Sequence, residues 1–384
     1  MKALVVGGNS GIGLSIVCEL LEQRYEKIYV VGKEPPVVSD LNQNIEEHFK
    51  KRVCFYKKNL LVEDYSFFDE INDIDTLIIS VGFGRVASFE NLLEEEISNL
   101  IKINYSVIVK ILKHYYHIIN SRKDFYTAVM VSICGRIASP LFSVYGSCKG
   151  GIRFLIENIN AELANTGIKN RILEVSPGSI KGTGFNGGKT NLLLLSPLAK
   201  EIVRNMYNRE TLFIPEYDIY KNVIERYNND PKAFAKQSFE YKINNNRLSS
   251  SPQLIVGYLS GTFDLFHIGH LNLLRRAKEQ CDYLIVSVHD SGAWKGKETF
   301  IPYNERRAIV ESIKYVDKVV EDYVEDSDAW EKYHFNKLFV GSDYKGTERF
   351  NRYEKLFDGK VEIVYFPYTK GTSSTQLRDA IKKK

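Results

Sequence analysis

The sequence predicts an α/β protein made of two Rossmann-like domains, each built on a parallel sheet. A length of 384 residues exceeds one ordinary domain, and a content of 44% hydrophobic and 12% aromatic residues is enough to bury two cores. Strand-like and helix-like patterns alternate in both halves of the chain. In addition, the stretches MKALVVGGNSGIG (residues 1–13) and GTFDLFHIGH (residues 261–270) each join a strand to a helix through a glycine-containing turn.

The elements of the first half follow one another in the rhythm of a doubly wound parallel sheet. KALVVGG reads as a strand, IGLSIVCELLEQ as a helix, KIYVVG as a strand and NQNIEEHFKK as a helix. Further strands are expected at RVCFYKKN, DTLIISVG, AVMVSI and RILEVSP. The rhythm stops at about Asn186, where a polar region rich in Tyr and Asn begins, with helical patterns such as SPLAKEIVRNMYN and YKNVIERYNN. We interpret this region as a segment that covers the substrate.

A connector separates the two halves. INNNRLSSSP, residues 243–252, has the composition of a flexible linker. A new α/β series then begins with the strand LIVGYLSG and the helix LNLLRRAKEQ, and it continues through DYLIVSVH, RRAIVESIKYV, KLFVG and VEIVYFP. We therefore predict a first domain over 1–245, a linker over 246–252 and a second domain over 253–384.

Composition limits the partners and the compartment. The chain has 52 basic and 48 acidic side chains, so a net charge of +4 gives no strong field toward nucleic acid or an anionic membrane, and neither is expected as a partner. No apolar run of 18 residues and no signal-peptide core occur, which predicts a soluble, cytoplasmic protein. The five cysteines lack metal-ligand spacing and suit a reducing compartment as free thiols. They are Cys18, Cys54, Cys134, Cys148 and Cys281.

The first glycine-rich turn has the chemistry of a phosphate site. Gly7, Gly8, Gly11 and Gly13 fall between a strand and a helix, so backbone amides and a helix N-terminus face whatever binds there. A pyrophosphate fits this arrangement. Tight strand-to-helix turns also use glycine for structural reasons alone, so the turn needs support from other residues.

That support comes from a phenol, an ammonium and a hydroxyl. Tyr145 and Lys149 occur in YGSCK at i, i+4 spacing, which places both on one helix face, and Ser132 ends the strand VMVS. We expect the lysine to lower the pKa of the tyrosine and the serine to hold a substrate oxygen. The phenol can then pass a proton to a carbonyl as hydride arrives.

At these residues the sequence resembles the short-chain dehydrogenase/reductase family, over about residues 1 to 240. Asn104 corresponds to the fourth catalytic residue of that family, and PGSIKGT (177–183) to its nicotinamide-side loop. SVGFG (80–84) replaces the usual Asn-Asn-Ala-Gly, a departure that we expect to affect strand packing more than chemistry. The resemblance implies cofactor contacts at Gly7, Asn9, Ser10, Gly11, Ile12, Gly13, Asn59, Leu60, Gly82, Pro177, Gly178, Ile180 and Thr183.

Lys33 bears on the choice of cofactor. It follows the second strand in VVGKE, where an acidic residue would accept from a ribose 2′-hydroxyl and a cation would instead favour a 2′-phosphate. We therefore predict NADPH. A lysine that merely faces solvent is the alternative, and Glu34 nearby keeps NADH possible.

The stretch GTFDLFHIGH points to a second anion site. His267 and His270 stand at a helix start beside Thr262, where two imidazoles can donate to phosphate oxygens. Metal binding through HxxH is the alternative. No cysteine or third histidine lies at supporting spacing, and a helix N-terminus favours anions over cations.

This stretch resembles the signature of nucleotidyltransferases related to glycerol-3-phosphate cytidylyltransferase, over about residues 254 to 384. GTSSTQLRDAI (371–381) stands for the Ser-Thr-Thr signature of that family, PYNERRAIVESIKYVD (302–317) for its arginine-bearing helix, WKGKE for its lysine loop and GSDYKG (341–346) for its cytosine loop. Tyr368 departs from an arginine common in the glycerol enzymes and puts the acceptor, or one phosphate contact, in doubt. The resemblance implies CTP contacts at Gly261, Thr262, Phe263, Asp264, Lys295, Gly341, Asp343, Ser373, Ser374 and Thr375.

Transfer of a cytidylyl group builds negative charge on the transferring phosphate and on the departing pyrophosphate. The residues expected to stabilise this charge are His267, His270, Lys297 and Arg306, with Mg²⁺ neutralising the triphosphate. The carboxylate of Asp264 has two interpretations: it helps to place the metal, or it fixes its loop by accepting backbone hydrogen bonds. No metal ligand is assigned.

The two resemblances together imply a fused reductase and cytidylyltransferase that acts in sequence. Reduction of a ketose phosphate, preferably ribulose 5-phosphate or xylulose 5-phosphate, would give a polyol phosphate, and CTP would convert it to CDP-ribitol, CDP-arabinitol or CDP-xylitol. Such products supply capsule and teichoic-like polymers. Glycerol and hexitol versions stay open, as do a non-catalytic first half and a regulatory second half. We expect a homodimer or a larger assembly, since both families commonly pair subunits.

Overall fold

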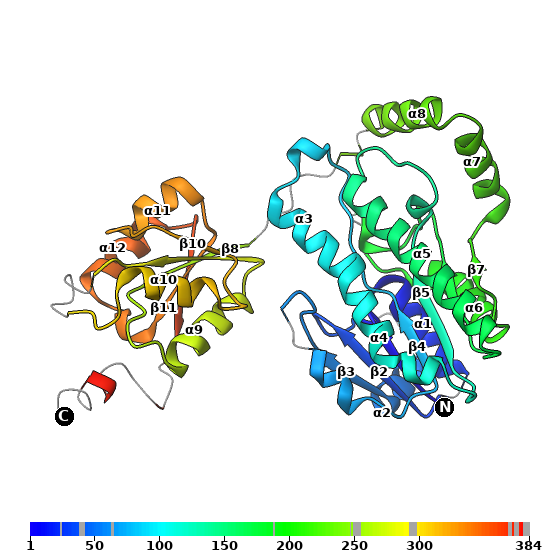
Figure 1. Cartoon of the computed structure of the whole chain (residues 1–384), viewed down its shortest axis with the longest axis horizontal. Helices are drawn as coiled ribbons and strands as arrows, with labels where there is room; N and C mark the ends of the chain where they lie inside the picture. The colour runs from blue at the N-terminus through cyan, green and yellow to red at the C-terminus, as the bar shows by residue number, and fades with distance from the viewer. Residues whose placement is uncertain are drawn as a thin grey trace. The chain divides into compact units, whose positions relative to one another are not determined.

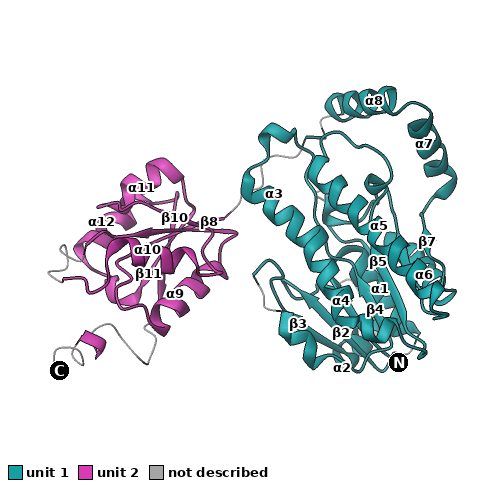
Figure 2. Ribbon diagram, in the orientation of Figure 1, with its two compact units in different colours: residues 1–250 teal, residues 251–384 magenta. Residues whose placement is uncertain are grey.

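The structure is a computed structural model, and it describes residues 1–23, 25–37, 43–62, 65–186, 189–245, 247–248, 255–291, 298–367, 371 and 376–378. The chain forms two compact units, Met1–Ser250 and Ser251–Lys384 (Figure 2). Most of the linker expected over 246–252 lies outside the described residues, so the domain limits stay a prediction. All five cysteines are free thiols. Within the described ranges, no helix is both long and apolar enough to cross a membrane.

The first unit is built on a seven-stranded parallel sheet, which confirms the doubly wound fold. Its strands are β1 (Lys2–Val6), β2 (Lys27–Gly32), β3 (Val53–Lys57), β4 (Thr76–Ile79), β5 (Tyr126–Met130), β6 (Ile172–Val175) and β7 (Leu212–Phe213). They lie in the order β3-β2-β1-β4-β5-β6-β7. The strand order therefore reverses between β1 and β4, and parallel sheets bind ligands at such a switch point, beyond the carboxyl ends of the strands.

Helices cover both faces of this sheet (Figure 1). The helices of this unit are α1 (Gly11–Glu22), α2 (Gln43–Arg52), α3 (Glu94–Ile101), α4 (Val107–Ile119), α5 (Ser143–Asn165), α6 (Leu192–Tyr207), α7 (Tyr217–Asn229) and α8 (Pro231–Asn244), of which α7 and α8 lie away from the sheet (Figure 1). Side chains alternate along β1, so that Leu4 and Val6 enter the core beneath α4 and α5, whereas Ala3 and Val5 enter the core beneath α1, α2 and α6. Burial on both faces explains why the strand is apolar throughout.

The segment after Asn186 differs in part from the sequence-based expectation. Ile202 and Val203 of α6 are fully buried in the same core as α1, and β7 pairs with β6 as the last strand of the sheet. This stretch thus continues the α/β framework instead of covering the substrate. The polar, Tyr- and Asn-rich composition concealed the apolar stripe of α6, and the part outside the framework begins only with α7.

The second unit has a smaller parallel sheet of the same kind. Its strands are β8 (Val256–Gly261), β9 (Tyr283–Val288), β10 (Lys318–Val320), β11 (Lys337–Gly341) and β12 (Glu362–Phe366), in the order β10-β9-β8-β11-β12. Its helices are α9 (Ile268–Lys278), α10 (Tyr303–Glu311), α11 (Asp326–Tyr333) and α12 (Glu348–Leu356). Leu259 of β8 faces the core under α9 and α10, and Tyr258 faces the core under α11 and α12. The switch point lies between β8 and β11, where the GTFDLFHIGH loop leaves β8.

Candidate active sites

The glycine-rich turn of the first unit closes tightly at the switch point. Gly7 has φ +83°, and a Cβ at Gly13 would lie 2.2 Å from the carbonyl oxygen of Gly7. A side chain at either position would therefore disrupt the turn or the entry to α1. Such a bare turn before a helix N-terminus fits the pyrophosphate of a dinucleotide. The expected contacts Ser10, Gly11 and Ile12 lie at the start of this helix.

The neighbouring strand ends place the other residues expected to bind the adenosine part of the cofactor. The side chain of Asn9 lies against Gly32 at the end of β2, where a Cβ would approach Asn9 Oδ1 to 2.5 Å. Lys33 is exposed directly after this strand, and Glu34 forms an ion pair of 3.0 Å with Lys57. Asn59 Oδ1 accepts a hydrogen bond from the amide of Leu61 at 3.2 Å. Leu60 is buried.

Ser132, Tyr145 and Lys149 come together as the sequence predicts. Tyr145 and Lys149 lie on the same face of α5, with the lysine Nζ 5.7 Å from the centre of the tyrosine ring. Lys149 Nζ donates to the carbonyl of Met130 at 2.9 Å, at the end of β5. Ser132 lies just beyond that strand end, accepts from the amide of Cys134 and hydrogen-bonds with the phenol of Tyr145. A hydroxyl, a phenol and an ammonium therefore share one buried site.

Asn104, the fourth expected catalytic residue, lies close to this group in a different element. It lies in a π-helical turn (Lys102–Ser106) between α3 and α4 and is fully buried. Its Nδ2 donates to the carbonyls of Phe83 and Leu100, at 2.8 and 3.0 Å. A π-helical turn interrupts the regular ladder of a helix and often marks a functional position.

The SVGFG segment, which departs from the family pattern, lies closer to this site than we expected from the sequence. Gly82 has φ +154°, and a Cβ there would lie 2.7 Å from Asn104 Oδ1 and 3.1 Å from Lys149 Nζ. The segment thus lies against two of the expected catalytic residues, so its effect reaches beyond strand packing. Glycine at this position is required by the close approach of both side chains.

Burial controls the protonation of the site. It raises the pKa of the Tyr145 phenol, and the hydrogen bond with Ser132 opposes the shift only in part. Burial lowers the pKa of Lys149 to about 8, against the opposing influence of the thiols of Cys148 and Cys134. In the protein alone, burial therefore outweighs the lowering of the tyrosine pKa that the sequence led us to expect from the lysine.

The loop after β6 is held over the same site by α7. The carbonyl of Pro177 accepts from the amide of Ile133 at 2.9 Å, which joins this loop to the one that follows Ser132. A Cβ at Gly178 would lie 1.7 Å from the hydroxyl of Tyr220, so this ring packs directly on the glycine. Further along the loop, Thr183 Oγ1 donates to the carbonyl of Ile180 at 3.1 Å.

Aromatic rings flank Tyr145. The ring of Phe142 lies 5.5 Å from that of Tyr145, and the ring of Phe185 lies 5.4 Å from it. A Cβ at Gly84 would come within 3.0 Å of both Phe185 and Tyr145. These rings limit the access of water to the phenol, which suits a proton transfer from a buried group.

In the second unit, His267 and His270 stack at the start of α9, with ring centres 4.1 Å apart. His267 is the N-cap, and its Nδ1 accepts from the amide of Gly269 at 3.0 Å. A Cβ at Gly269 would lie 2.7 Å from the His267 ring, so glycine is needed for the ring to fold over the turn. The neutral ring of His267 therefore carries its proton on Nε2 as a donor, and burial lowers its pKa in favour of that form.

The loop before these histidines is conformationally strained. Phe263 and Leu265 adopt φ values of +52° and +50°, which residues other than glycine rarely take. The rings of Phe263 and Phe266 each lie 5.4 Å from that of His270. The strained loop thus places two aromatic rings against the imidazole of His270 and helps to hold it in position.

Asp264 fixes this loop to two other segments. Its carboxylate accepts from the amides of Phe300 and Ile301, at 3.0 to 3.2 Å. It also forms an ion pair of 2.6 Å with Arg378, which follows the Ser-Ser-Thr segment. These contacts favour the loop-fixing interpretation of Asp264 over a role in placing a metal. Within the described parts of the chain, no group of three His, Cys, Asp or Glu residues could hold a metal ion.

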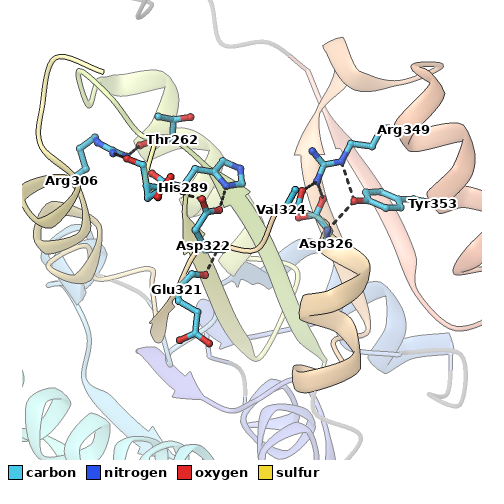
Figure 3. A network of polar contacts seen from close by, with 11 residues as sticks. Thr262, His289, Arg306, Glu321, Asp322, Val324, Asp326, Arg349 and Tyr353 are labelled. Atoms are coloured by element: carbon cyan, nitrogen blue, oxygen red, sulfur yellow. Dashed lines mark hydrogen bonds and ion pairs between the residues drawn. The ribbon is translucent and has the colours of Figure 1, made fainter. Parts of the chain in front are cut away.

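Arg306 differs from its expected role. It is fully buried in α10, and its guanidinium donates to the carbonyls of Ile301, Thr262, His289 and Asp290 at 2.5 to 2.8 Å (Figure 3). With its donors directed at four backbone oxygens, this arginine joins the loops after β8 and β9 instead of facing a phosphate. These contacts favour a positioning role for Arg306, and its assignment to direct charge stabilisation stays a prediction.

Two acidic groups in this unit were not assigned a role from the sequence. His289, at the carboxyl end of β9, binds Asp322 at 2.5 Å (Figure 3). On the other face, Asp326 is buried beside Arg349, and its backbone amide donates a hydrogen bond to the hydroxyl of Tyr353. The pairing of His289 with Asp322 could have been predicted from the sequence. DYLIVSVH and KVVED each end a strand with a polar residue, and such strand ends meet at the binding edge of a parallel sheet.

The remaining expected residues lie partly within and partly outside the part of the chain that the structure describes. Gly341 ends β11 at the same edge, and a Cβ there would lie 2.4 Å from Asp343 Oδ1, so this carboxylate turns back over the strand end. The other six positions lie outside the described residues: Lys295, Lys297, Tyr368, Ser373, Ser374 and Thr375.

Comparisons with known proteins match the two units of the chain to two different families. Residues 1–191 match the short chain dehydrogenase family, and residues 258–380 match the cytidylyltransferase-like family. A glycerol-3-phosphate cytidylyltransferase of Staphylococcus aureus is 36% identical over 125 residues, which are 32% of this chain and 90% of that protein. An uncharacterized oxidoreductase of Staphylococcus epidermidis is 23% identical over 194 residues, which are 49% of this chain and 83% of that protein. A solved short-chain dehydrogenase of Streptomyces avermitilis is 16% identical, covers 64% of this chain and 98% of its own, and has a TM-score of 0.49.

Proposed function

The chain belongs to the cytidylyltransferase-like family in its second unit and is a short-chain dehydrogenase in its first, and from this premise we propose a two-step synthesis of a CDP-polyol. The chain is thus an oxidoreductase and a nucleotidyltransferase in one polypeptide. In the proposed sequence, the first unit reduces a ketose phosphate to a polyol phosphate and the second couples that product to CTP. The observation that carries the proposal is the presence in one chain of the Ser132, Tyr145 and Lys149 group and of the stacked His267 and His270.

In the reductase unit, each side chain has a separate task. The bare turn around Gly7 would hold NADPH, which would supply the hydride for the carbonyl carbon. Ser132 holds the carbonyl oxygen, Tyr145 donates its phenolic proton to that oxygen, and the Lys149 ammonium stabilises the resulting phenolate. The exposed Lys33 supports NADPH over NADH through a 2′-phosphate contact, with NADH as the alternative.

In the transferase unit, a phosphate oxygen of the polyol phosphate bonds to the α-phosphorus of CTP as the bond to pyrophosphate breaks. His267 and His270 donate to phosphate oxygens at the start of α9, and we assign Lys297 to the same charge. Arg306 and Asp264 hold the loops. We propose that Mg²⁺ binds together with the triphosphate of CTP, since Mg²⁺ commonly takes several of its ligands from substrate phosphates.

The substrate is proposed to be a pentulose phosphate, with ribulose 5-phosphate or xylulose 5-phosphate preferred. The product would be CDP-ribitol, CDP-arabinitol or CDP-xylitol, for capsule or teichoic-like polymers. The glycerol analogue is the second candidate, because the relative from Staphylococcus aureus is a glycerol-3-phosphate cytidylyltransferase. Tyr368, where an arginine is common in the glycerol enzymes, supports the longer acceptor. We further propose a cytoplasmic homodimer.

The test is a coupled assay on the full chain. NADPH oxidation is measured with ribulose 5-phosphate, xylulose 5-phosphate, a hexulose phosphate and dihydroxyacetone phosphate, and pyrophosphate release is measured after CTP is added. We expect oxidation and pyrophosphate release with a pentulose phosphate. Activity with dihydroxyacetone phosphate alone would establish the glycerol version, and pyrophosphate release from ready-made polyol phosphate without NADPH oxidation would make the first unit non-catalytic.

A further inference from the structure

Lys242 is a buried cation beside the reductase site. It lies on α8, beyond the residues that match the short chain dehydrogenase family, and its side chain is only 8% exposed. Its Nζ donates to Ser139 Oγ at 2.7 Å and to the carbonyl of Pro140 at 2.6 Å. These two residues belong to the loop that leads from Ser132 to Tyr145. The third N–H of the ammonium is left for another acceptor.

The ammonium also lies close to the catalytic tyrosine. Lys242 Nζ is 5.2 Å from the ring centre of Phe142, and that ring is 5.5 Å from the ring of Tyr145. The thiol of Cys134 is near enough to influence the pKa of Lys242, of Lys149 and of Tyr145. The ammonium of Lys242 and the ring of Tyr145 therefore both lie near the ring of Phe142, and the same thiol influences the pKa of both groups.

The charge of Lys242 is not balanced by a carboxylate. The arginines of the adjoining loops each have a buried partner: Arg85 pairs with Glu96 at 2.7 Å, and Arg136 pairs with Glu174 at 2.6 Å. Among the described residues, no carboxylate forms an ion pair with Lys242. Burial lowers its pKa, and the thiol of Cys134 opposes this shift only in part. Since an uncompensated buried charge is costly, such a cation is suited to receive an anion.

We propose that Lys242 is a specificity-determining residue that binds the phosphate group of the ketose phosphate while Tyr145 faces its carbonyl. The inference rests on the proposed reduction and names the group that selects its substrate. A pentulose 5-phosphate carries its carbonyl near one end of the carbon chain and its phosphate at the other, which fits a phenol and an ammonium that both lie near the ring of Phe142. Phosphate would take the third N–H of Lys242, and α8 would thereby couple substrate binding to the loop of Ser139 and Pro140.

The experiment replaces the charge and keeps a hydrogen-bond donor. Lys242→Gln is assayed with ribulose 5-phosphate, with unphosphorylated ribulose and with inorganic phosphate as a competitor. We expect KM for ribulose 5-phosphate to rise roughly ten- to a hundredfold, as for the loss of a hydrogen bond to a charged group, with kcat little changed. Reduction of unphosphorylated ribulose should keep its kcat/KM. Inorganic phosphate should compete less well, by a factor similar to the rise in KM for ribulose 5-phosphate. Lys242→Arg should restore most of the discrimination.

Lys236→Met is the matched control, since this lysine of the same helix is exposed and should change neither substrate preference nor phosphate inhibition. An equal loss with both sugars in Lys242→Gln would overturn the inference and make the lysine a support of the loop. If neither Lys242 variant folds, as judged by thermal unfolding of the first unit, failure of inorganic phosphate to compete in the wild type would overturn it. A wild type that reduces no ketose phosphate would instead reject the proposed function.

Discussion

The carboxylate of Asp264 and the guanidinium of Arg378 form an ion pair of 2.6 Å that joins two signature segments of the second unit. Asp264 belongs to GTFDLFHIGH, and Arg378 follows the Ser-Ser-Thr segment by three residues. Arg378 also donates to the carbonyl of Glu298 at 2.6 Å. Two segments more than a hundred residues apart in the chain, both expected to contact the triphosphate, are thus held together by one pair of side chains.

Asp264→Asn and Arg378→Gln should therefore have the same effect. Breaking a buried pair from either side leaves a charge uncompensated and costs about 3 to 5 kcal/mol in the stability of a unit. We expect both variants to slow pyrophosphate release, to unfold at lower temperature and to combine less than additively in the double variant. NADPH oxidation serves as the internal control. A raised Mg²⁺ requirement in Asp264→Asn alone would instead support the metal-placing interpretation.

Tyr145→Phe should abolish ketose phosphate reduction and spare cytidylyl transfer. The substitution keeps the ring against Phe142 and Phe185 and removes only the hydroxyl that hydrogen-bonds with Ser132. Loss of a positioned proton donor typically lowers a rate by a factor of roughly 100 to 10,000. NADPH oxidation and pyrophosphate release from ready-made polyol phosphate are measured on the same preparation. Reduction at a rate near that of the wild type would remove the phenol from its proposed role.

Reduction should decline above about pH 8. The pKa of Lys149 is lowered to about 8 by burial, and the lysine must be charged to stabilise the phenolate of Tyr145. As pH rises through about 8, the folded protein loses this proton, and kcat/KM for NADPH, which reports the free enzyme, should fall. The measurement is a pH profile of NADPH oxidation, with pyrophosphate release as the reference activity. A flat profile to pH 10 would contradict the assignment.

The same shift has the opposite effect on stability. Between about 8 and the ordinary lysine value of 10.5, the unfolded chain keeps the Lys149 proton that the folded chain has released. The unfolded state then binds more protons, so the contribution of this residue to the free energy of unfolding rises with pH in that window. Below about pH 8 the buried ammonium is charged and its burial is unfavourable. Lys149→Met should remove this component from the pH dependence of thermal unfolding.

The fold could be predicted from the sequence because its strands are apolar on both faces and its turns are marked by glycine. The turn at Gly7 and Gly13 and the helix that carries Tyr145 and Lys149 follow from local pattern alone. The role of α6 was missed, since its buried stripe is interrupted by polar residues and only the pairing of β7 shows that the sheet continues.

The site could be predicted only where its residues fall into a motif. The four donor contacts of Arg306 depend on carbonyls from two separate loops, those after β8 and after β9, which no spacing in the sequence reveals. Lys242 reaches its site from a helix about a hundred residues beyond Ser139, so its proximity to Phe142 is a property of the fold. Contacts of this long-range kind account for most of what the sequence left open.

Lys33→Asp should shift the cofactor preference toward NADH. Lys33 is exposed beyond Gly32, and a carboxylate there would repel a 2′-phosphate and accept from a 2′-hydroxyl. The ratio of kcat/KM for NADPH to that for NADH is measured with the same ketose phosphate. Glu34 is held by Lys57, so Lys57→Met is the matched control for a changed local charge. An unchanged ratio in Lys33→Asp would show that this lysine only faces solvent.

His270→Ala should cripple cytidylyl transfer while ketose phosphate reduction continues. The ring lies at the start of α9, stacked on His267 and held by Phe263 and Phe266, so a donor to the triphosphate is fixed before substrate binds. Removal of one preorganised donor of this kind typically slows a reaction about a hundred- to a thousandfold, or roughly 2.7 to 4 kcal/mol. The measurement is pyrophosphate release from CTP and polyol phosphate, with NADPH oxidation and thermal unfolding as checks on folding. His270→Asn, which keeps a donor of smaller size, should fall between the wild type and alanine. Normal pyrophosphate release in His270→Ala would reject the assignment, and a parallel loss of both activities would make the histidine structural.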